Sequence, residues 1–439
     1  MQDAYYEDFK QLRQRLPGQQ ASWVSGLREQ ALEQFMAHGF PTPREEAWKY
    51  TDVRPIAKRR LRVAETGGEL PAAALRPHLL GDEQAYRIVF LDGRFAPALS
   101  QLDGLPEGVT LRSFAAALQE DPAVLEGFLG HHADVEGHPF VALNTAFMND
   151  GVFLRLQDGV ALEAPLHIVY LSSGTEDSVA HVRNLFIADP NSRAVVVESY
   201  AGVGDGAYLT NAVTEVVARS GAAVEHYKLQ QESAKGFHVA GVYAYQERDS
   251  RYVSHNVALG ARLSRTDIGV RLDAEDAACT LNGLYLGSGR QHIDTHTRID
   301  HLKPNCTSHE WYKGVLGGHA RGVFDGRVVV HPDAQHTDAQ QANNNLLLSR
   351  DAEVDSKPQL EIYADDVKCS HGSTVGQLDE TALFYLRSRA LDEPTARSIL
   401  VYAFASDILK GMRLVPVRSR LEEQVAQHLL GGRSLEEIL

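Results

Sequence analysis

The residues of this chain best suited to bind a metal are a cysteine and a histidine two positions apart, Cys369 and His371, in the stretch DDVKCSHGSTVGQLDE. On an extended segment both side chains would leave the same face. A thiolate and a neutral imidazole are donors that iron, zinc and copper accept. Two donors do not complete a four-coordinate site, so the missing ligands would come from elsewhere, most simply from a partner chain. The alternative is a Cys–His nucleophilic pair, which needs the imidazole aimed at the sulfur and a third group that orients it.

A second candidate lies in RQHIDTHTRIDH, where His292, Asp294 and His296 alternate. On a strand, these three side chains would share a face and could hold a metal. Polar ladders are also common on the solvated wall of a repetitive β fold. A stand-alone metalloenzyme built on His292 and His296 is therefore one alternative function, and metal analysis of the isolated chain would test it.

Other motif-like features predict no chemistry. The glycines of AGVGDGAY precede an alternating, strand-like segment, whereas a nucleotide-binding glycine loop must open a helix. Cys279 and Cys306 lie in sequences that give no reason for a lowered thiol pKa, so we expect them to be small buried hydrophobic residues. No G-x-x-x-x-G-K-[ST] phosphate-binding motif occurs in the sequence.

The charge balance excludes several function classes. Among 439 residues, 58 acidic against 43 basic side chains give a net charge of −15. Such a chain is poorly suited to nucleic acid or to an anionic membrane surface. No run of 18 apolar residues occurs, and the first residues lack the pattern of a signal peptide. Three widely spaced cysteines form no disulfide framework, so we expect a cytoplasmic protein.

The positions of the apolar residues divide the chain into three regions. Residues 1–148 form a mixed, mainly helical region, in which Gly39 is a predicted helix C-cap and Asp92-Gly93 a predicted turn between strands. Residues 149–375 contain short segments rich in Val, Ile and Tyr. Residues 376–439 are helical again, with Asp392 as a predicted N-cap.

The middle region predicts a mainly β fold. Its segments of about five to ten residues alternate between apolar and polar and are bounded by Gly, Asp, Asn or Pro. Such a run is typical of a sandwich, a propeller or a β-solenoid. No WD-like signature marks propeller blades, and a sandwich of this length would be unusually large. The small and β-branched residues favour stacked parallel coils, with helices capping both ends of the solenoid.

Three long stretches resemble one family closely: PTPREEAWKYTDV, RGVFDGRVVVHPDAQHTDAQQANNNLLLS and AEVDSKPQLEIYADDVKCSHGSTVGQLDETALFYLRSRAL. They are similar to the SufD-type members of the SufB/SufD family, scaffold subunits of the SUF machinery that assembles iron–sulfur clusters. The resemblance implies a right-handed parallel β-helix core with a helical N-terminal region and a small helical C-terminal domain. It also implies a non-catalytic subunit that pairs with SufB, while ATPase activity resides in SufC, an ABC-type partner present in two copies.

The resemblance also implies roles for particular residues. Cys369 and His371 would lie at the interface with SufB and hold a transient iron–sulfur cluster or its iron, with none bound stably by the chain alone. The segment from Leu378 to Met412 would dock SufC; its candidate contact residues are Leu383, Phe384, Tyr385, Ile399, Tyr402, Phe404 and Ile408. Reduced flavin is a further candidate component of the complex. Independently of the resemblance, an exposed solenoid end would allow the isolated chain to form a homodimer.

One more function class stays open besides the scaffold and the metalloenzyme. A β-helix enzyme acting on polysaccharide would have the same fold. Such enzymes are usually exported and display an aromatic groove on the solenoid wall. The chain has only three tryptophans and no signal-peptide pattern, which argues against this alternative.

Overall fold

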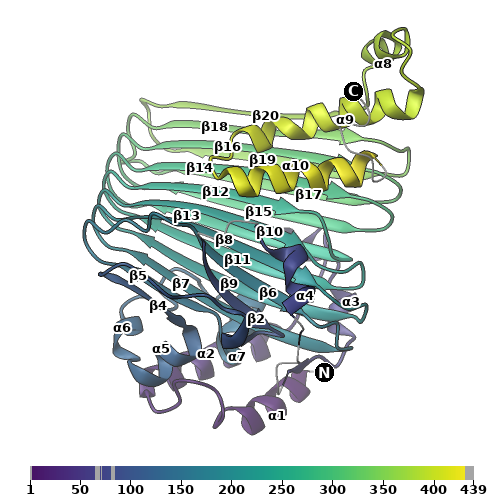
Figure 1. The fold of residues 1–439 in the computed structure, drawn as a ribbon. Helices are drawn as coiled ribbons and strands as arrows, with labels where there is room; N and C mark the ends of the chain where they lie inside the picture. The colour runs from purple at the N-terminus through teal and green to yellow at the C-terminus, as the bar shows by residue number, and fades with distance from the viewer. Residues whose placement is uncertain (1, 65–69, 71, 81–84, 431–439) are drawn as a thin grey trace.

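Two long sheets form the walls of a flattened solenoid in the computed structural model, which describes residues 2–64, 70, 72–80 and 85–430 (Figure 1). From residue 152 to residue 376 the chain alternates between the two sheets, and neighbouring strands of each sheet pair in parallel. The predicted parallel β-helix with a helical N-terminal region and C-terminal helices is therefore confirmed. The prediction that helices cap both ends of the solenoid is wrong for the C-terminal end, which is left open.

Sheet A is one wall. Its strands are β1 (Arg62–Val63), β4 (Val109–Ser113), β5 (Val152–Leu156), β7 (Ser178–Ala188), β9 (Tyr208–Ala218), β11 (Phe237–Gln246), β13 (Leu263–Leu272), β15 (His292–His301), β17 (Arg321–Val330) and β19 (Glu353–Ile362). Sheet B is the other wall. Its strands are β2 (Tyr86–Leu91), β3 (Arg94–Phe95), β6 (Leu166–Ser172), β8 (Arg193–Gly202), β10 (Ala223–Gln231), β12 (Arg251–Ala258), β14 (Ala278–Gly287), β16 (Thr307–Leu316), β18 (Asp338–Leu347) and β20 (Lys368–Gly376).

The corner that leads from sheet A to sheet B repeats one backbone conformation. One residue per turn has a positive φ of 57–69°, and its N–H donates to a carbonyl oxygen of the next turn. These residues are Asn191, Gly221, Asp249, Asp276, Asn305 and His336. Gly, Asn and Asp are the residue types that enter this left-handed region at least cost. The corner therefore ties successive turns together by a column of hydrogen bonds.

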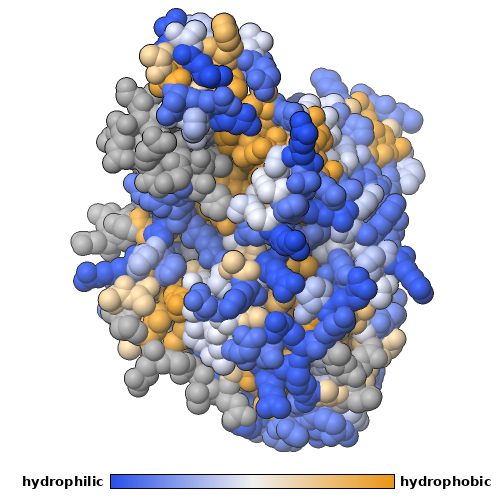
Figure 2. Space-filling view, turned by 90° about the vertical axis from the view of Figure 1, so that its right-hand side faces the viewer, coloured by the Kyte–Doolittle hydropathy of each residue, from blue (hydrophilic) through white to orange (hydrophobic). Residues whose placement is uncertain are grey.

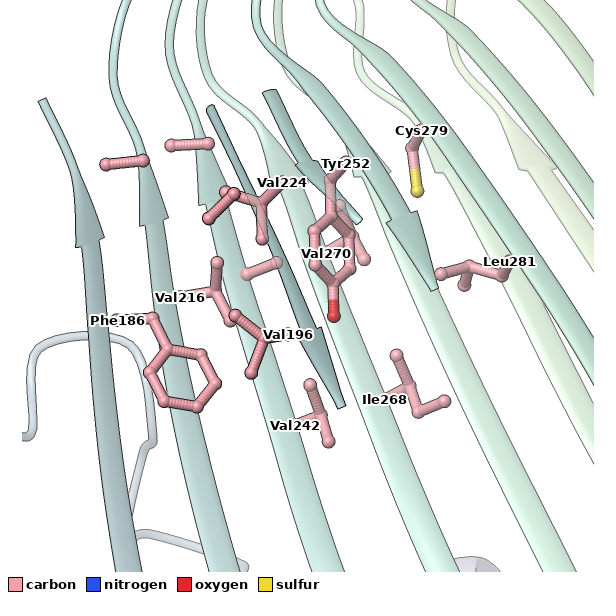
Figure 3. Close-up of a cluster of buried hydrophobic side chains, with 14 of the residues drawn as sticks. Phe186, Val196, Val216, Val224, Val242, Tyr252, Ile268, Val270, Cys279 and Leu281 are labelled. Carbon is pink, nitrogen blue, oxygen red and sulfur yellow. The ribbon is translucent and has the colours of Figure 1, made fainter. Parts of the chain in front are cut away.

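The core lies between the two sheets, because every second side chain of each strand points inward. Figure 3 shows part of this cluster, in which Val196 and Val224 of sheet B face Val216 and Val242 of sheet A. Residues at the same position of successive turns lie in register, as in the column Cys279, Ser308, Ala339 and Cys369. The solenoid lumen is thus filled by stacked rows of side chains.

The N-terminal region covers the first turns of the solenoid (Figure 1). Its helices are α1 (Gln2–Leu12), α2 (Ser22–His38), η1 (Glu46–Trp48), α3 (Arg54–Ala57), α4 (Ala72–Leu75), η2 (Arg76–His78), η3 (Pro97–Leu99), α5 (Phe114–Glu120), α6 (Ala123–Glu126) and α7 (Pro139–Phe147). The predicted C-cap is confirmed, since Gly39 has φ 71° and its N–H donates to Phe35 O. The predicted Asp92-Gly93 turn is also confirmed, and it joins β2 to β3.

Buried polar contacts fix the N-terminal region to sheet A. The carboxylate of Glu215 on β9 accepts hydrogen bonds from the main-chain N–H groups of Gly130 and His132, at 2.9 and 3.0 Å. It also pairs with Arg183 of β7 at 2.5 Å, and neither side chain is exposed. Removing one partner of such a buried pair typically costs about 3–5 kcal/mol. The N-terminal region also supplies strands β1 to β4 to the two sheets, so the β-sheet core begins before residue 149.

The C-terminal helices are α8 (Glu380–Arg387), α9 (Glu393–Lys410) and α10 (Val415–Leu430). Asp392 is the predicted N-cap of α9, and its carboxylate accepts from Thr395 N at 2.9 Å. Helices α9 and α10 lie on the outer face of sheet B, whereas α8 projects beyond it (Figure 1). Residues 431–439 of the predicted C-terminal region are outside the described residues. None of the helices in the described ranges is long and apolar enough to cross a membrane.

Candidate functional site

Cys369 and His371 lie on β20, which is the last strand of sheet B. They are in register with Ala339 and Gln341 of β18, whose side chains are buried in the lumen. Both predicted metal-binding residues therefore belong to the inward-facing row of the final turn. Their common face follows from their spacing of two on a strand, as predicted.

The end of the solenoid at β19 and β20 is open. Cys369 is half-buried and packs against the lumen core, whereas His371 is exposed, because no further turn covers them. Burial raises the pKa of the Cys369 thiol. Neither residue is fully buried in the single chain, so their burial at an interface would require a partner on this surface.

Polar contacts join the two strands of this last turn across the lumen. Ser356 of β19 lies 2.8 Å from Ser373 of β20 through their hydroxyl oxygens. The Ser356 hydroxyl also lies within hydrogen-bond distance of Asn343 Oδ1 in the turn beneath, at 2.7 Å. Side-chain contacts, in addition to the backbone hydrogen bonds between strands, therefore connect β19 and β20 to the body of the solenoid.

The chemistry of the pair fits a metal better than a nucleophile. The raised pKa of the Cys369 thiol disfavours the thiolate that a nucleophile needs, whereas a bound metal ion itself displaces the proton of a thiol that coordinates it. The sulfur and imidazole donors suit iron as a substrate or cargo. No group of three His, Cys, Asp or Glu side chains able to hold an ion occurs in the described part of the chain. Cys369 and His371 alone do not complete a metal site, and their role as part of a shared site stays a prediction.

His292 and His296 occupy the outer face of β15 together with Asp294, as predicted, but other contacts hold all three. His292 Nε2 lies 2.8 Å from the Thr51 hydroxyl, which also donates to Asp294 at 2.6 Å. His296 Nε2 lies 3.0 Å from Asp294, and Arg265 donates to the same carboxylate at 3.0 Å. The cluster fastens the N-terminal region to sheet A, and metal binding there stays a prediction that this geometry does not favour.

The predicted ATPase-docking residues separate into two groups. Phe384 and Tyr385 on α8 are 74% and 55% exposed, so they are available to a partner. Ile399, Tyr402 and Phe404 on α9 are half-buried. Leu383 and Ile408 are buried within the chain.

Burial leaves Leu383 and Ile408 inaccessible to a partner in the single chain, and docking by the other candidates stays a prediction. Ile408 belongs to the cluster that α9 forms with α10 and with Val315 and Leu346 of sheet B. The broad apolar surface of α9 is explained by packing on two sides, against the solenoid and against the last helix. Figure 2 shows that hydrophobic residues remain visible on and below the projecting end of the molecule.

Cys279 and Cys306 are buried, as predicted, and burial raises the pKa of the Cys306 thiol to about 11. The glycines of AGVGDGAY serve tight packing between turns. A Cβ on Gly204 or Gly206 would collide with the carbonyl oxygen of Ser173 or Gly174 on the adjacent turn. This close packing agrees with the prediction that these glycines do not form a nucleotide-binding loop.

A pocket of about 620 Å³ lies on the outer face of sheet A beside Trp48 and Tyr243. Four of its carboxylates are held in ion pairs: Asp267 with Arg265, Asp300 with Arg298, and Asp325 and Glu46 with Lys357. The fifth, Asp134, accepts a hydrogen bond from Glu136 N at 2.9 Å. A glycosidase needs two carboxyl groups free to act as acid and base or nucleophile. The pocket therefore lends no support to the polysaccharide-active alternative.

A set of buried polar residues inside the lumen was missed by the sequence analysis. Glu310 of β16 accepts a hydrogen bond from Gln341 Nε2 at 2.6 Å, and burial raises the pKa of its carboxyl to about 7. Deeper in the lumen, Glu198 contacts His226, Tyr200 and Thr214. The only sign of these residues in the sequence is a charged residue at a position that the strand alternation places inward, as Glu310 is in the segment TSHEWY.

Comparison with known proteins agrees with this architecture. The family model "SUF system FeS cluster assembly, SufBD core domain" matches residues 170–404, and "SufBD protein N-terminal region" matches residues 1–168. A Synechocystis protein named as an iron–sulfur cluster assembly SufBD family protein is 32% identical, covering 93% of this chain and 92% of its own length. The iron–sulfur cluster assembly proteins SufD of Escherichia coli and Bacillus subtilis are 30% and 25% identical, each over 92% of this chain and 93% of the relative. The chain belongs to the SufBD family of iron–sulfur cluster assembly proteins.

Proposed function

We propose that the chain is a non-catalytic scaffold subunit that holds iron or a nascent cluster at its open end. The observation that carries this proposal is the position of Cys369 and His371. Both belong to the inward-facing row of β20, the last strand of sheet B. Their sulfur and nitrogen donors therefore lie at the open end of the solenoid. A subunit that caps this end could supply the remaining ligands.

The proposed partner at the open end is a SufB-type paralogue. Strand β20 is the last strand in its sheet and exposes most of its side chains, so its free edge can accept another strand. A paralogue with a similar solenoid would continue both the sheet and the lumen. In the absence of that partner, the same edge is expected to pair with a second copy of this chain.

The proposed partner of the C-terminal helices is a SufC-type ABC ATPase. Phe384 and Tyr385 are large, exposed and apolar or aromatic, which is typical of residues at the centre of an interface. Helix α8 carries them beyond the solenoid wall (Figure 1). ATP hydrolysis would take place in that partner, and the whole complex would serve iron acquisition and cluster assembly. Binding of reduced flavin by the complex stays a prediction.

The test is anaerobic co-expression of the chain with its SufB-type and SufC-type partners. Wild type is compared with Cys369→Ser and His371→Ala, and complex stoichiometry and cluster absorbance are measured on the same samples. We expect the complex to form in all cases and the cluster to be lost in both variants. Ser370→Ala is the matched control, because Ser370 is exposed on the opposite face of the same strand.

Normal cluster formation in both variants would contradict the proposed role of the pair and leave the chain a scaffold only. Loss of the complex itself in the two variants, but not in Ser370→Ala, would show that the residues serve the interface instead.

A further inference from the structure

We propose that Gln341 positions His371 by accepting a hydrogen bond from its imidazole, and that Glu310 holds the Gln341 amide in the orientation this requires. The inference rests on the proposed function, because it concerns how His371 is prepared to receive iron. It adds two residues that touch neither the metal nor the partner.

The three side chains form one column through the last three turns of sheet B. Glu310 on β16 is in register with Gln341 on β18, and Gln341 is in register with His371 on β20. Neighbouring strands lie about 4.8 Å apart, so each side chain lies directly over the one beneath it. Glu310 and Gln341 are both buried, at 3% exposure each, and His371 closes the column at the open end.

The amide of Gln341 is fixed on one side. Its Nε2 donates to Glu310 Oε2 at 2.6 Å. The same nitrogen lies against Gly326 of β17, where a Cβ would collide with it. Gln341 therefore reaches across the lumen from sheet B to sheet A, and its orientation follows from a buried carboxyl group and from the space that a glycine leaves.

The other side of the amide is unpartnered. Gln341 Oε1 is buried and has no hydrogen-bond partner among the described residues. Leaving such an acceptor unpaired costs about 1–3 kcal/mol, so a donor at this position would be stabilised. The residue directly above it in the column is His371, whose imidazole carries an N–H in every protonation state.

This hydrogen bond would select the form of the histidine that can bind metal. In neutral imidazole one nitrogen carries the proton and the other has the free lone pair. If the Gln341 oxygen accepts from one nitrogen, the lone pair of the other is presented to the metal. Carbonyl and carboxylate groups perform this task for most metal-binding histidines. Cys369 has only Ala339 beneath it, so the arrangement acts on the histidine alone.

The test uses the full chain labelled with ¹⁵N-histidine, with His371→Ala to assign the His371 signal. Long-range ¹H–¹⁵N spectra at pH 8 report the imidazole tautomer directly, without metal or partner. We expect one tautomer to dominate in wild type and both to be populated in Gln341→Leu, which keeps most of the volume but removes the acceptor. The double variant Glu310→Gln/Gln341→Glu exchanges donor and acceptor within the pair. It keeps both the anchoring hydrogen bond and an acceptor oxygen beneath His371, so it should restore the wild-type spectrum. Glu310→Leu alone should release the amide and give a mixture.

Gln340→Leu is the matched control, since Gln340 is exposed on the opposite face of β18 and should leave the His371 signal unchanged. An unchanged His371 tautomer in Gln341→Leu would overturn the proposal. Failure of the exchanged pair Glu310→Gln/Gln341→Glu to restore the wild-type tautomer would also overturn it, because the mixture in Gln341→Leu would then reflect packing.

Titration with Co²⁺ separates this inference from the proposed function. In the complex with the SufB-type partner, we expect thiolate-to-Co²⁺ absorbance that Cys369→Ser abolishes. Gln341→Leu should weaken Co²⁺ binding by about 10- to 100-fold. If wild type binds no Co²⁺ at this pair, the proposed function fails, while the tautomer spectra still decide whether Gln341 positions His371.

Discussion

Lys313 on β16 and Asp407 on α9 form an ion pair across the surface of sheet B, with 3.0 Å between Nζ and Oδ2. The same ammonium donates to the main-chain oxygen of Phe404 at 2.9 Å and lies 4.5 Å from the centre of its ring. Lys313 is nearly buried, and its hydrogen bond lowers the pKa of Asp407. One lysine thus fixes the helix that leads to the proposed ATPase-docking end.

Lys313→Met should therefore loosen α9 while leaving the solenoid intact. The loss of charge-assisted hydrogen bonds is expected to reduce the free energy of unfolding by about 1–3 kcal/mol. Hydrogen exchange of α9 and α10, compared with exchange of β10 to β14, measures where the effect lies. Lys410→Met is the control, because Lys410 contacts the same Asp407 but is exposed, and should change stability by less than about 0.5 kcal/mol. Equal protection of α9 in wild type and Lys313→Met would contradict this prediction.

The buried carboxyl of Glu310 predicts a pH dependence of stability. Burial raises its pKa from 4.5 to about 7 in the folded chain, so the folded state holds its proton to higher pH than the unfolded state. The stabilisation is present below pH 4.5 and is lost as the pH rises through about 7. At about 1.4 kcal/mol per pKa unit, the loss is about 3 kcal/mol.

Glu310→Gln removes this titration. As the pH rises from 5 to 8, the free energy of unfolding of wild type should therefore fall relative to that of the variant. Urea unfolding at several pH values measures it. Glu353→Gln, at an exposed position of β19, is the control and should run parallel to wild type. A constant difference between Glu310→Gln and wild type across this range would show that the carboxyl stays in one charge state.

Thiol exposure should distinguish Cys369 from the two other cysteines. Cys279 and Cys306 are buried, and burial raises the pKa of both thiols. At protein concentrations low enough to keep the isolated chain monomeric, we expect one thiol to react faster than the other two, and Cys369→Ser should abolish this fast reaction. The other two thiols should react only on unfolding. Mass spectrometry after pulse alkylation assigns each site.

The same labelling tests gating in the complex. Pairing at the open end should protect Cys369, and ATP-driven dimerisation of the two SufC-type subunits should pull on the C-terminal helices and shift this interface. Alkylation of Cys369 should then be faster with ATP than without it. Rates that do not respond to ATP in the assembled complex would rule out gating of this kind.

Docking on α8 can be tested without disturbing the fold. Phe384→Ser and Tyr385→Ser change exposed side chains, so the free energy of unfolding should stay within about 0.5 kcal/mol of wild type. Loss of an anchoring aromatic side chain typically weakens an interface by about 2 kcal/mol or more. Calorimetry with the purified SufC-type ATPase measures the affinity, and Tyr363→Ser, which is exposed on the solenoid, is the control. Unchanged affinity in both α8 variants would exclude α8 from the interface.

Local chemistry made several features predictable from the sequence. Gly39 as a C-cap, Asp392 as an N-cap and Asp92-Gly93 as a turn follow from backbone preferences that hold in any context. The common face of Cys369 and His371 follows from the period of a strand. The alternation over residues 149–375 likewise predicted the β-rich core.

Features that depend on stacking could not be read from the sequence. Successive turns differ in length: Ala278 to Thr307 spans 29 residues, Thr307 to Asp338 spans 31, and Asp338 to Lys368 spans 30. Without a constant period, nothing in the sequence places Glu310 under Gln341 or Gln341 under His371. The apolar surface of α9 was similarly ambiguous, since a helix that packs on two sides has the same composition as one that awaits a partner.

The corner column described above has a consequence for how such a protein can change its size. Each turn needs one corner residue that adopts a positive φ, which is Asn, Asp or Gly in five of the six turns and His336 in the other. Each turn has about 30 residues in all and contacts mainly the turns on either side. A whole turn could thus be gained or lost between Asn191 and Asn305 while the N-terminal region and the last turn stay as they are. The solenoid would then behave as an adjustable spacer, which sets the reach from one end of the assembly to the other in steps of about 4.8 Å.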